Sequence, residues 1–447
     1  MRYALREEFF GALCYDSVDK DYIHLDHLAL RMLRAPREPL SETDLQQHET
    51  SREEVQEVLD DLAQREMIDN FKTLPNKPLP RMLSAPTRIF LEITYRCPEH
   101  CEHCYTDSGE RRAGELDRAD KFSIVDQMAQ MGCYRLSIAG GEPLVDRDFF
   151  PVVERAISHY IDVSFSTSGI PVTARTAQQL AALDIRTINV SLDGWDESSY
   201  GSVRGTGRFK YMLRGVNHLR RHYQGKLAAK CTLMTTNILG VERIIRLAED
   251  LGFDVVKFNC VREAGRATQA QSLIPTQDEY LDVVRRLAEI YNQRDSKVKL
   301  VLPVNPYQKM GEDQPDFIGE LGFGCYAGKE CFCITAEGQI QPCTSFGPTM
   351  YVDGNVRERR LIDAWLNGGA MRAFRDMTGS SACQTCPSYS GCRGGCYLRS
   401  LTAYGDIGAT DPYCYERRND PWRTADAEAS RVSGSPRPIA ALPLSGA

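Results

Sequence analysis

The chain has 447 residues, of which 42% are hydrophobic and 26% charged, and its formal net charge is −7. This is the balance of an ordinary soluble globular protein. The acidic charge argues against a nucleic-acid or anionic-membrane partner, because both attract basic surfaces. The N-terminal sequence MRYALREEFFGAL lacks the apolar segment of a signal peptide, and no apolar run approaches the roughly 18 residues of a membrane span. We therefore expect a cytoplasmic protein.

Residues 1–73 predict a small mixed module. The sequence EEFFGALCYDSVDKDYIHLD suggests two strands joined by a turn at 16–20, and three short helices follow. In the clearest of these, SREEVQEVLDDLAQRE, Ser51 and Glu54 fit a capping box at the helix start. Strands followed by helices in this order indicate a winged-helix-like module. The Pro-rich residues 74–86 predict an extended linker.

Strand and helix patterns alternate from residue 87 to 310. The six candidate strands are RIFLEIT, CYRLSIAG, IDVSFST, IRTINVSL, LAAKCTLMT and DVVKFNC. Six such units predict an α/β fold in which parallel strands form a partial (β/α)6 TIM barrel. Ligands of such folds bind at the carboxyl ends of the strands, so we expect the site in the loops that follow them.

Sixteen cysteines are the main anomaly of the composition, because a reducing compartment favours metal or redox chemistry over disulfides. Three lie at 97–104 and nine at 325–414. Four scattered thiols are expected to be small buried hydrophobic residues: Cys14, Cys133, Cys231 and Cys260. The cysteine-rich region 311–417 has little apolar sequence for a core of its own, so metal clusters would have to stabilise it. The tail 418–447 is predicted to be disordered.

The sequence TYRCPEHCEHCY follows the first barrel strand and contains Cys97, Cys101 and Cys104. A tetrahedral zinc site needs four ligands and disulfides need an even number of cysteines. Three thiolates instead leave one corner of an iron–sulfur cube free to bind a ligand. The spacing, followed by Tyr105, resembles the signature of the radical SAM superfamily. That resemblance implies a cluster that binds S-adenosylmethionine and cleaves it to a 5′-deoxyadenosyl radical. A partial zinc site with a distant fourth ligand is the alternative.

Motifs at the other strand ends resemble the S-adenosylmethionine contacts of this superfamily. AGGEP resembles the motif that binds the methionyl amine, STSG the ribose contacts, and SLDG with the arginine of SVRGTGRF the contacts to the methionyl carboxylate. REAGRA at 262–267 is similar to an adenine-side turn. The resemblance implies these cofactor-binding residues: Tyr105, Gly140, Gly141, Glu142, Pro143, Thr167, Ser168, Ser191, Asp193 and Arg204.

The C-terminal cysteines resemble the SPASM domain of peptide- and protein-modifying radical SAM enzymes. Gly338 lies five residues before Cys343, in the expected turn of a hairpin that delivers this cysteine. The resemblance implies two auxiliary [4Fe–4S] clusters, and three clusters in all. The first would be held by Cys325, Cys331, Cys343 and Cys396, and the second by Cys383, Cys386, Cys392 and Cys414. Cys333 lies outside the pattern and could compete with Cys331. Two zinc knuckles are the alternative, although only one CxxC pair is present here.

The N-terminal module resembles the peptide-recognition element of enzymes that modify ribosomally made peptides, as in the small peptide chaperone of pyrroloquinoline quinone biosynthesis. The resemblance implies that a leader peptide adds a strand to an exposed edge, at 9–15 or 22–25. A DNA-binding winged helix is disfavoured by the shortage of basic residues, and a purely structural cap is the remaining alternative.

Together these motifs predict a radical SAM/SPASM maturase, similar to the enzyme that cross-links the pyrroloquinoline quinone precursor and to sactionine synthases. Its partners would be a ribosomally made precursor peptide and an electron donor such as flavodoxin or ferredoxin, with no nucleic acid and no membrane. The rival hypotheses are a maturase of a folded protein, of the sulfatase-maturase type, a tetrapyrrole-modifying enzyme, and a zinc-stabilised scaffold. The sequence names neither the peptide, nor the bond formed, nor a general acid or base.

Overall fold

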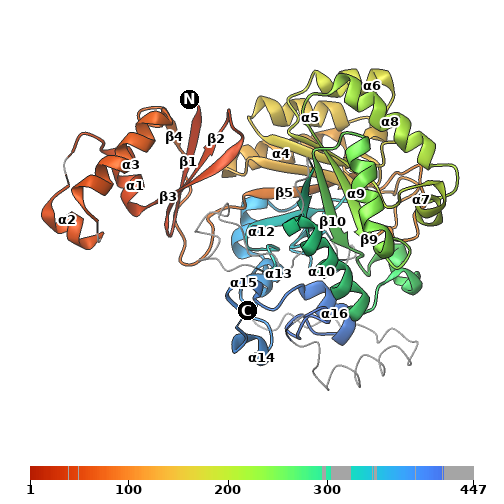
Figure 1. The fold of residues 1–447 in the computed structure, drawn as a ribbon. Helices are drawn as coiled ribbons and strands as arrows, with labels where there is room; N and C mark the ends of the chain where they lie inside the picture. The colour runs from red at the N-terminus through yellow and green to blue at the C-terminus, as the bar shows by residue number, and fades with distance from the viewer. Residues whose placement is uncertain are drawn as a thin grey trace.

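The computed structural model describes residues 1–38, 40–48, 50–293, 298–303, 324–344, 346, 350–387, 389–414 and 416. Figure 1 shows three parts. A small N-terminal module stands beside a larger α/β unit, and a region of short helices lies below that unit. The predicted disordered tail falls outside the described residues.

The N-terminal module is a four-stranded sheet covered on one face by three helices. Its strands are β1 (Tyr3–Glu8), β2 (Gly11–Asp16), β3 (Asp21–Asp26) and β4 (Phe71–Thr73), and its helices are α1 (His27–Arg34), α2 (Glu42–Gln47) and α3 (Arg52–Gln64). The strand order is β3-β2-β1-β4. Helix α3 begins at Ser51, whose side chain and that of Glu54 form the predicted capping box. Two strands were expected at the start of this module, but a turn at 9–10 splits the first of them into β1 and β2.

The α/β unit is a nine-stranded sheet in the order β11-β10-β9-β8-β7-β6-β5-β12-β13. Neighbouring strands from β11 to β12 run parallel, and only the terminal pair β12–β13 is antiparallel. The strands are β5 (Arg88–Thr94), β6 (Arg135–Gly140), β7 (Asp162–Thr167), β8 (Thr187–Ser191), β9 (Lys226–Leu233), β10 (Val255–Cys260), β11 (Lys299–Val301), β12 (Cys331–Ile334) and β13 (Ile340–Gln341). All six predicted strands are confirmed, from β5 to β10. The hairpin expected around Gly338 joins β12 to β13 and extends the sheet at the β5 edge.

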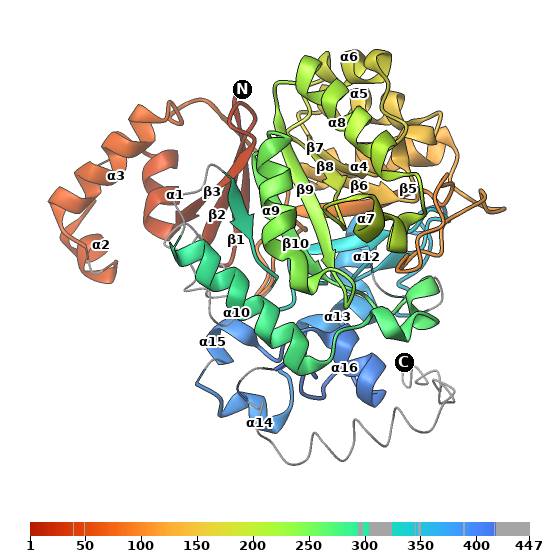
Figure 2. The ribbon, with the colours of Figure 1, turned by 45° about the vertical axis from the view of Figure 1, so that its right-hand side comes forward.

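Crossover helices connect the parallel strands and cover the outer face of the sheet. Figure 2 shows α9 lying beside β9 and α10 running obliquely below it. The α-helices are α4 (Arg118–Met131), α5 (Phe149–Ser158), α6 (Ala174–Ala181), α7 (Glu197–Arg204), α8 (Phe209–His222), α9 (Val241–Asp250) and α10 (Gln277–Gln293). Short 3-10 helices are η1 (Pro143–Val145), η2 (Ile238–Gly240), η3 (Gly265–Thr268) and η4 (Gln271–Leu273). Helix α8 begins at Phe209, the last residue of the SVRGTGRF motif.

Side chains alternate across each strand of the sheet. In β5 the alternate residues Ile89, Leu91 and Ile93 are fully buried in the core shared with the helices. Phe90 and Glu92 therefore point to the opposite, concave face. The same alternation places polar side chains on that face in the neighbouring strands: Ser137, Ser164, Asn189, Lys230 and Lys257. The concave face is thus a polar interior, at the carboxyl end of which the predicted motifs emerge.

A buried ion pair docks the N-terminal module on the barrel. Arg6 and Glu8 are each 1% exposed, and Arg6 Nε donates to Glu8 Oε1 over 2.6 Å. Arg6 Nη1 also donates to the carbonyl oxygens of Pro86 (3.1 Å) and Gly132 (3.0 Å). The Glu8 carboxylate accepts from the backbone N–H of Ser84 over 2.7 Å. One pair therefore joins the module, the segment before β5 and the loop before β6.

Apolar packing supplements that pair. Phe10, Leu13 and Tyr15 belong to the barrel core, and the Tyr15 ring stacks on Tyr134 at 4.7 Å. The segment 74–86, predicted as a linker, is packed between the two units: Leu83 is fully buried, and its carbonyl accepts from Trp365 Nε1. The module is therefore fixed to the amino-terminal ends of the strands.

The C-terminal region is built from short helices around a small apolar cluster. The helices are α12 (Leu361–Asn367), α13 (Gly369–Arg375), α14 (Ser381–Gln384), α15 (Tyr389–Cys392) and α16 (Tyr397–Tyr404). The cluster has five buried members: Ala327, Phe346, Phe374, Tyr397 and Leu401. The cysteine-bearing segments surround this cluster, as the weak apolar pattern of the sequence predicts.

Candidate functional site

The loop after β5 that carries Cys97, Cys101 and Cys104 is closed at its base. The backbone N–H of Cys97 donates to Gly109 O over 2.7 Å, and Gly109 N–H donates to Tyr95 O over 3.0 Å. Both ends of the loop therefore stay at the carboxyl end of β5, where parallel α/β folds place their ligands.

An arginine from the turn after β10 holds the same loop from the other side. Arg266 Nε donates to Cys101 O (2.9 Å), and its Nη1 donates to Ser108 O (2.8 Å). A Cβ on Gly265 would lie 2.5 Å from Cys104 O, so only glycine allows this approach. The REAGRA turn thus touches the cysteine loop directly.

The three thiols of the loop lie close enough to influence one another. Burial, together with the charge of neighbouring groups that include the other thiols, raises the pKa values of Cys97 and Cys101 to about 12. Within the described residues no three His, Cys, Asp or Glu side chains converge as ligands of one metal ion. In an iron–sulfur cluster, however, each thiolate binds its own iron. Three neighbouring thiols on one loop are the donor set that such a cluster needs.

The AGGEP motif packs against the start of the cysteine loop. A Cβ on Gly140 would lie 2.4 Å from Thr94 O, and one on Gly141 would lie 2.3 Å from Arg96 O. Backbone N–H groups of Gly141 and Glu142 donate to these same two carbonyls. The two glycines therefore allow β6 to end directly beside the loop. Pro143 begins η1 and is buried.

Glu142 joins the AGGEP and STSG motifs. Its carboxylate accepts from Thr167 Oγ1 (2.8 Å), from the N–H and Oγ of Ser168 (2.7 Å each) and from Leu144 N–H (3.2 Å). These four donors fill the acceptor positions of a carboxylate, and burial raises its pKa. An ammonium group could bind Glu142, as the sequence predicts, only if Ser168 Oγ turned away. That role stays a prediction.

Asp193 and Arg204 form a buried pair at the end of β8. Arg204 Nε donates to Asp193 Oδ2 over 2.6 Å, and Arg204 Nη1 to Glu99 over 3.3 Å. Burial opposes ionisation of Asp193, but Arg204 and His103 lower its pKa overall. The sequence paired Arg204 with Ser191 as carboxylate contacts. No hydrogen bond joins these two described side chains, and the direct partners of Arg204 are carboxylates of the protein.

Sequence reasoning missed three polar residues around Arg204. Glu99 and His103 lie between the loop cysteines, and Tyr200 lies in α7. Each has a buried polar atom without a hydrogen-bond partner, namely Glu99 Oε1, His103 Nδ1 and Tyr200 Oη. Glu99 and His103 could have been found from their position inside the cysteine motif, but a role for Tyr200 required the fold.

Glu92 and Tyr105 were separated in the sequence but meet on the concave face. The hydroxyls of Tyr95 and Tyr105 lie close enough to the Glu92 carboxyl group to lower its pKa. The guanidinium of Arg262 lies 5.1 Å from the centre of the Tyr105 ring. Tyr105, predicted as a cofactor contact, therefore lies between the cysteine loop and the interior of the barrel.

The C-terminal thiols fall into two groups. Neighbouring thiols affect the pKa values of Cys325, Cys331 and Cys396, with Cys343 common to all three. Cys392 is similarly influenced by Cys414 and Cys383. The backbone N–H of Cys386 donates to Cys383 O. The structure thus brings together the same sets that the sequence assigned to two clusters. Their role as ligands stays a prediction.

None of the sixteen cysteines forms a disulfide, and all of them lie in the part of the chain that the structure describes. Cys14, Cys133 and Cys231 are fully buried, as predicted. Cys260 differs because it is only half-buried and its Sγ contacts Tyr280 Oη (2.9 Å) and Arg399 Nη1 (3.3 Å). Cys333 is fully buried in β12, on the concave face next to Cys343 and Glu92.

Comparison with known proteins agrees with this geometry. Residues 91–251 match the radical SAM superfamily, and residues 325–387 match an iron–sulfur cluster-binding domain, SPASM. A mycofactocin maturase, MftC, from Mycobacterium tuberculosis H37Rv is 28% identical over 77% of this chain and 88% of its own length. An AdoMet-dependent heme synthase from Methanosarcina barkeri is 26% identical over 75% of this chain and 98% of its own.

Among solved structures, Streptococcus suis SuiB bound to S-adenosylmethionine shares the fold. Its TM-score is 0.69 at 17% identity, over 93% of this chain and 99% of SuiB. The 7% of this chain that is not aligned with SuiB is shorter than the 73-residue N-terminal module, so the likeness extends into that module. None of the described helices has the length and apolar character needed to cross a bilayer. The domain matches and the clustered thiols identify this chain as a radical SAM/SPASM enzyme, which uses S-adenosylmethionine and [4Fe–4S] clusters.

Proposed function

We propose that the enzyme modifies a ribosomally made precursor peptide, binding its leader on the N-terminal module and its core in the concave interior of the barrel. The relatives support this proposal: MftC is a mycofactocin maturase, and SuiB has been solved bound to its precursor peptide SuiA, with a TM-score of 0.68 to this chain. When bound, S-adenosylmethionine and the clusters would supply the radical that removes hydrogen and accept the second electron. An electron donor such as flavodoxin or ferredoxin would reduce them.

The observation that carries the proposal is an unpaired strand edge on a module fixed to the barrel. Strand β3 is at the edge of its sheet, paired only with β2 among the described strands. A peptide could therefore add a strand beside β3. The alternative edge considered from sequence, residues 9–15, is wrong, because β2 is paired on both sides by β1 and β3.

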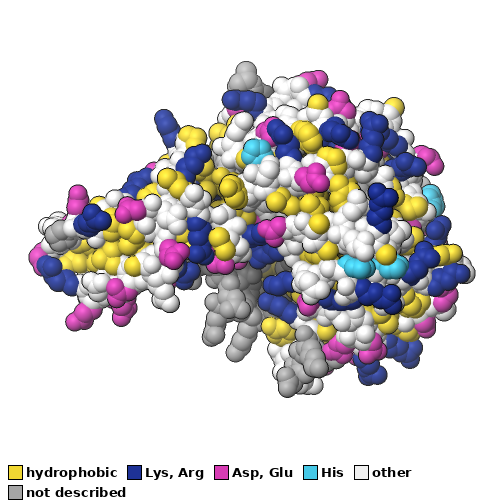
Figure 3. All heavy atoms as spheres, turned by 90° about the horizontal axis from the view of Figure 1, so that it is seen from above, with side chains coloured by type: hydrophobic (Ala, Val, Ile, Leu, Met, Phe, Trp, Pro, Cys, Tyr) yellow, Lys and Arg dark blue, Asp and Glu magenta, His cyan; other side chains and the backbone are white. Residues whose placement is uncertain are grey.

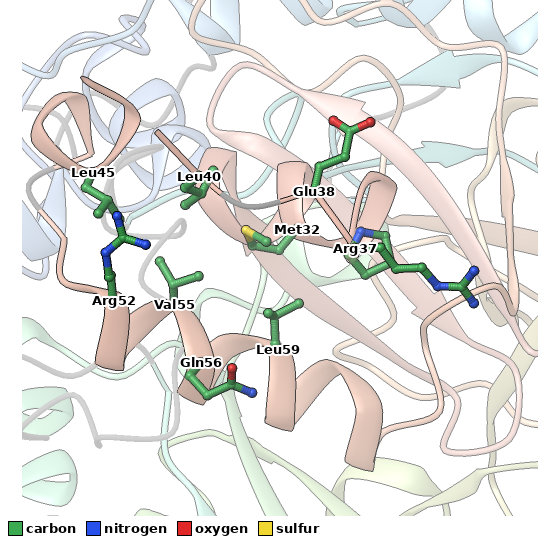
Figure 4. A pocket seen from close by; sticks show the side chains of 10 residues that line it. Met32, Arg37, Glu38, Leu40, Leu45, Arg52, Val55, Gln56 and Leu59 are labelled. Carbon is green, nitrogen blue, oxygen red and sulfur yellow. The ribbon is translucent and has the colours of Figure 1, made fainter. Parts of the chain in front are cut away.

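A hollow of about 480 Å³ on the same module offers apolar contacts. Figure 4 shows Met32, Leu40, Val55 and Leu59 pointing toward one another, whereas Arg37 points away. In Figure 3 hydrophobic side chains are visible on the part of the module distant from the barrel. We propose that apolar leader side chains occupy this hollow, since its volume suits a few such groups.

The site and the module lie at opposite ends of the strands. Lys20 of the module contacts Asp184, and Asp21 contacts Arg135 and Arg186, all at the amino-terminal ends. The motifs for S-adenosylmethionine lie at the carboxyl ends. Crossing the eight residues of β9 takes about 26 Å at roughly 3.3 Å per residue. The modified residue should therefore lie at least about eight residues from the leader segment that is bound.

The test is anaerobic co-expression with the short peptide encoded beside the gene, followed by intact-mass and fragment analysis. Loss of two hydrogens from the peptide would support the proposal. Val55→Asp places a carboxylate in the hollow and should abolish most of the modification, whereas Gln64→Glu on the exposed end of α3 should not. Deletion of the whole module is a poorer test, because it would expose Phe10 and Leu13 of the barrel core.

A tetrapyrrole substrate is the second candidate, because the heme synthase matches 98% of its own length. Neither a tetrapyrrole substrate nor a folded-protein substrate would require a leader-binding module. Unchanged peptide mass, with 5′-deoxyadenosine formed in the absence of peptide, would favour them. Equal activity of Val55→Asp and the wild type would do the same.

A further inference from the structure

Glu92 is a buried carboxylate on the concave face, for which the motifs assign no role. It is 3% exposed and lies two residues before the end of β5, below the cysteine loop. Tyr95 and Tyr105 lie beside it, and both act to lower the pKa of its carboxyl group. The strand alternation places its side chain on the concave face, opposite the core residues Leu91 and Ile93.

The surroundings of Glu92 come from three elements. Arg112 of the cysteine-loop segment and Arg262 of the turn after β10 present positive charge to it. Cys333 of β12 is the neutral thiol beside it. Glu92 and both arginines lie in the described part of the chain, and neither arginine forms an ion pair with Glu92. Their positive charges therefore act on the carboxylate without direct contact.

The other carboxylate on the concave face of the described strands serves as a comparison. Asp162 begins β7, at the opposite end of the sheet, and Arg186 Nη1 donates to its Oδ2 over 3.1 Å. Asp162 is therefore already paired and lies away from the predicted S-adenosylmethionine contacts. Glu92 is the carboxylate of this face that lies on the reactive side.

The proposed reaction requires a proton acceptor. Removal of a hydrogen atom from the peptide leaves a carbon radical. When that radical closes onto an N–H, O–H or S–H group, or becomes a double bond, it loses one electron and one proton. An oxidised iron–sulfur cluster can take the electron, but the proton needs a base. We propose that the carboxylate of Glu92 accepts this proton. This inference rests on the proposed function and deepens it by assigning one step to one residue.

The ionisation of Glu92 suits that task. Burial raises the pKa of its carboxyl group to about 7, although the tyrosine hydroxyls and Arg262 oppose the shift. A base is most effective when its pKa lies near the working pH, because it is then ionised yet able to hold a proton. Near neutral pH Glu92 can therefore alternate between the two forms.

The first experiment measures the carboxyl group itself in the full chain with its clusters bound and no S-adenosylmethionine added. Infrared difference spectra between the wild type and Glu92→Gln should show a protonated carboxyl band that disappears as the pH is raised through about 7. Asp162→Asn is the matched control, since it removes a carboxylate from the same face. The proposal is overturned if the wild type shows no carboxyl band that both titrates near neutral pH and is missing from Glu92→Gln.

The second experiment compares product with 5′-deoxyadenosine in the reconstituted enzyme. Glu92→Gln should still form 5′-deoxyadenosine, while modified peptide falls about 100-fold, the usual contribution of a positioned base. Glu92→Asp should recover part of the lost peptide modification and shift the pH dependence of that modification. Asp162→Asn should change the ratio of modified peptide to 5′-deoxyadenosine less than twofold. Loss of 5′-deoxyadenosine in Glu92→Gln, or an unchanged ratio, would overturn the proposal. If the wild type leaves the peptide unmodified, the proposed function fails, and the infrared titration still decides on Glu92.

Discussion

The N-terminal module and the C-terminal cysteine-rich region are both attached to the barrel, but different forces hold them. The module has thirteen buried apolar residues in a core of its own, and the Arg6–Glu8 pair fixes it to the barrel. Among its described residues, the C-terminal region has an apolar cluster with five buried members and two helices of four residues each. So small a core contributes little free energy of folding.

This difference separates recognition from chemistry. Packing and hydrogen bonds alone hold the module, so its orientation relative to the barrel should not depend on cofactors. The C-terminal region instead carries eight thiols in two groups, and metal binding in such regions contributes directly to folding. Removing iron should therefore affect one end of the molecule and spare the other.

The largest effect is expected from removal of the clusters. Anaerobic chelation of iron should lower the protection of backbone amides against hydrogen exchange in residues 383–414 by about 10⁴-fold or more, that is by at least roughly 5.5 kcal/mol of local opening free energy, because structural metal sites contribute on the order of 10 kcal/mol to folding. Residues 3–26 should keep their protection. Equal loss at both ends, or retained protection at 383–414, would contradict the comparison.

A second, smaller effect should come from breaking the docking pair of the module. Arg6→Met leaves the Glu8 carboxylate buried without its cation, which should lower the free energy of unfolding by roughly 3–5 kcal/mol. Arg52→Met removes the exposed partner of Glu42 and should cost at most about 1 kcal/mol. Denaturant unfolding measures both. Similar values for the two variants would show that the buried pair does not hold the module.

The smallest effect is a pH dependence from Glu330, which precedes β12. Burial raises its pKa to about 7, although Arg88 and Arg135 oppose the shift. The folded state therefore holds this proton more tightly than the unfolded state, whose pKa is near 4.5. Stability should fall by about 2–3 kcal/mol as the pH rises from 4.5 to 7. In Glu330→Gln the free energy of unfolding should no longer fall in this pH range. The same dependence of the free energy of unfolding on pH in the variant and the wild type would show that Glu330 does not cause it.

Local patterns in the sequence predicted much of this protein. The six strands from β5 to β10, the capping box at Ser51 and the hairpin around Gly338 follow from apolar alternation, side-chain caps and turn chemistry, which act over a few residues. The cysteine spacing indicated clusters, because neighbours three or four residues apart on one loop must stay close in space.

Only the tertiary structure decided which distant groups meet. It placed Arg266 on the cysteine loop, gave Arg204 a buried partner in Asp193, and brought Glu92 to Tyr105 on the concave face. It also put β2 inside its sheet and left β3 at the edge. Strand order and the contacts between distant side chains depend on long-range packing, which local sequence patterns do not show. By itself it therefore determined the elements and the chemistry of this enzyme, whereas the partners of each charged group depended on how those elements pack.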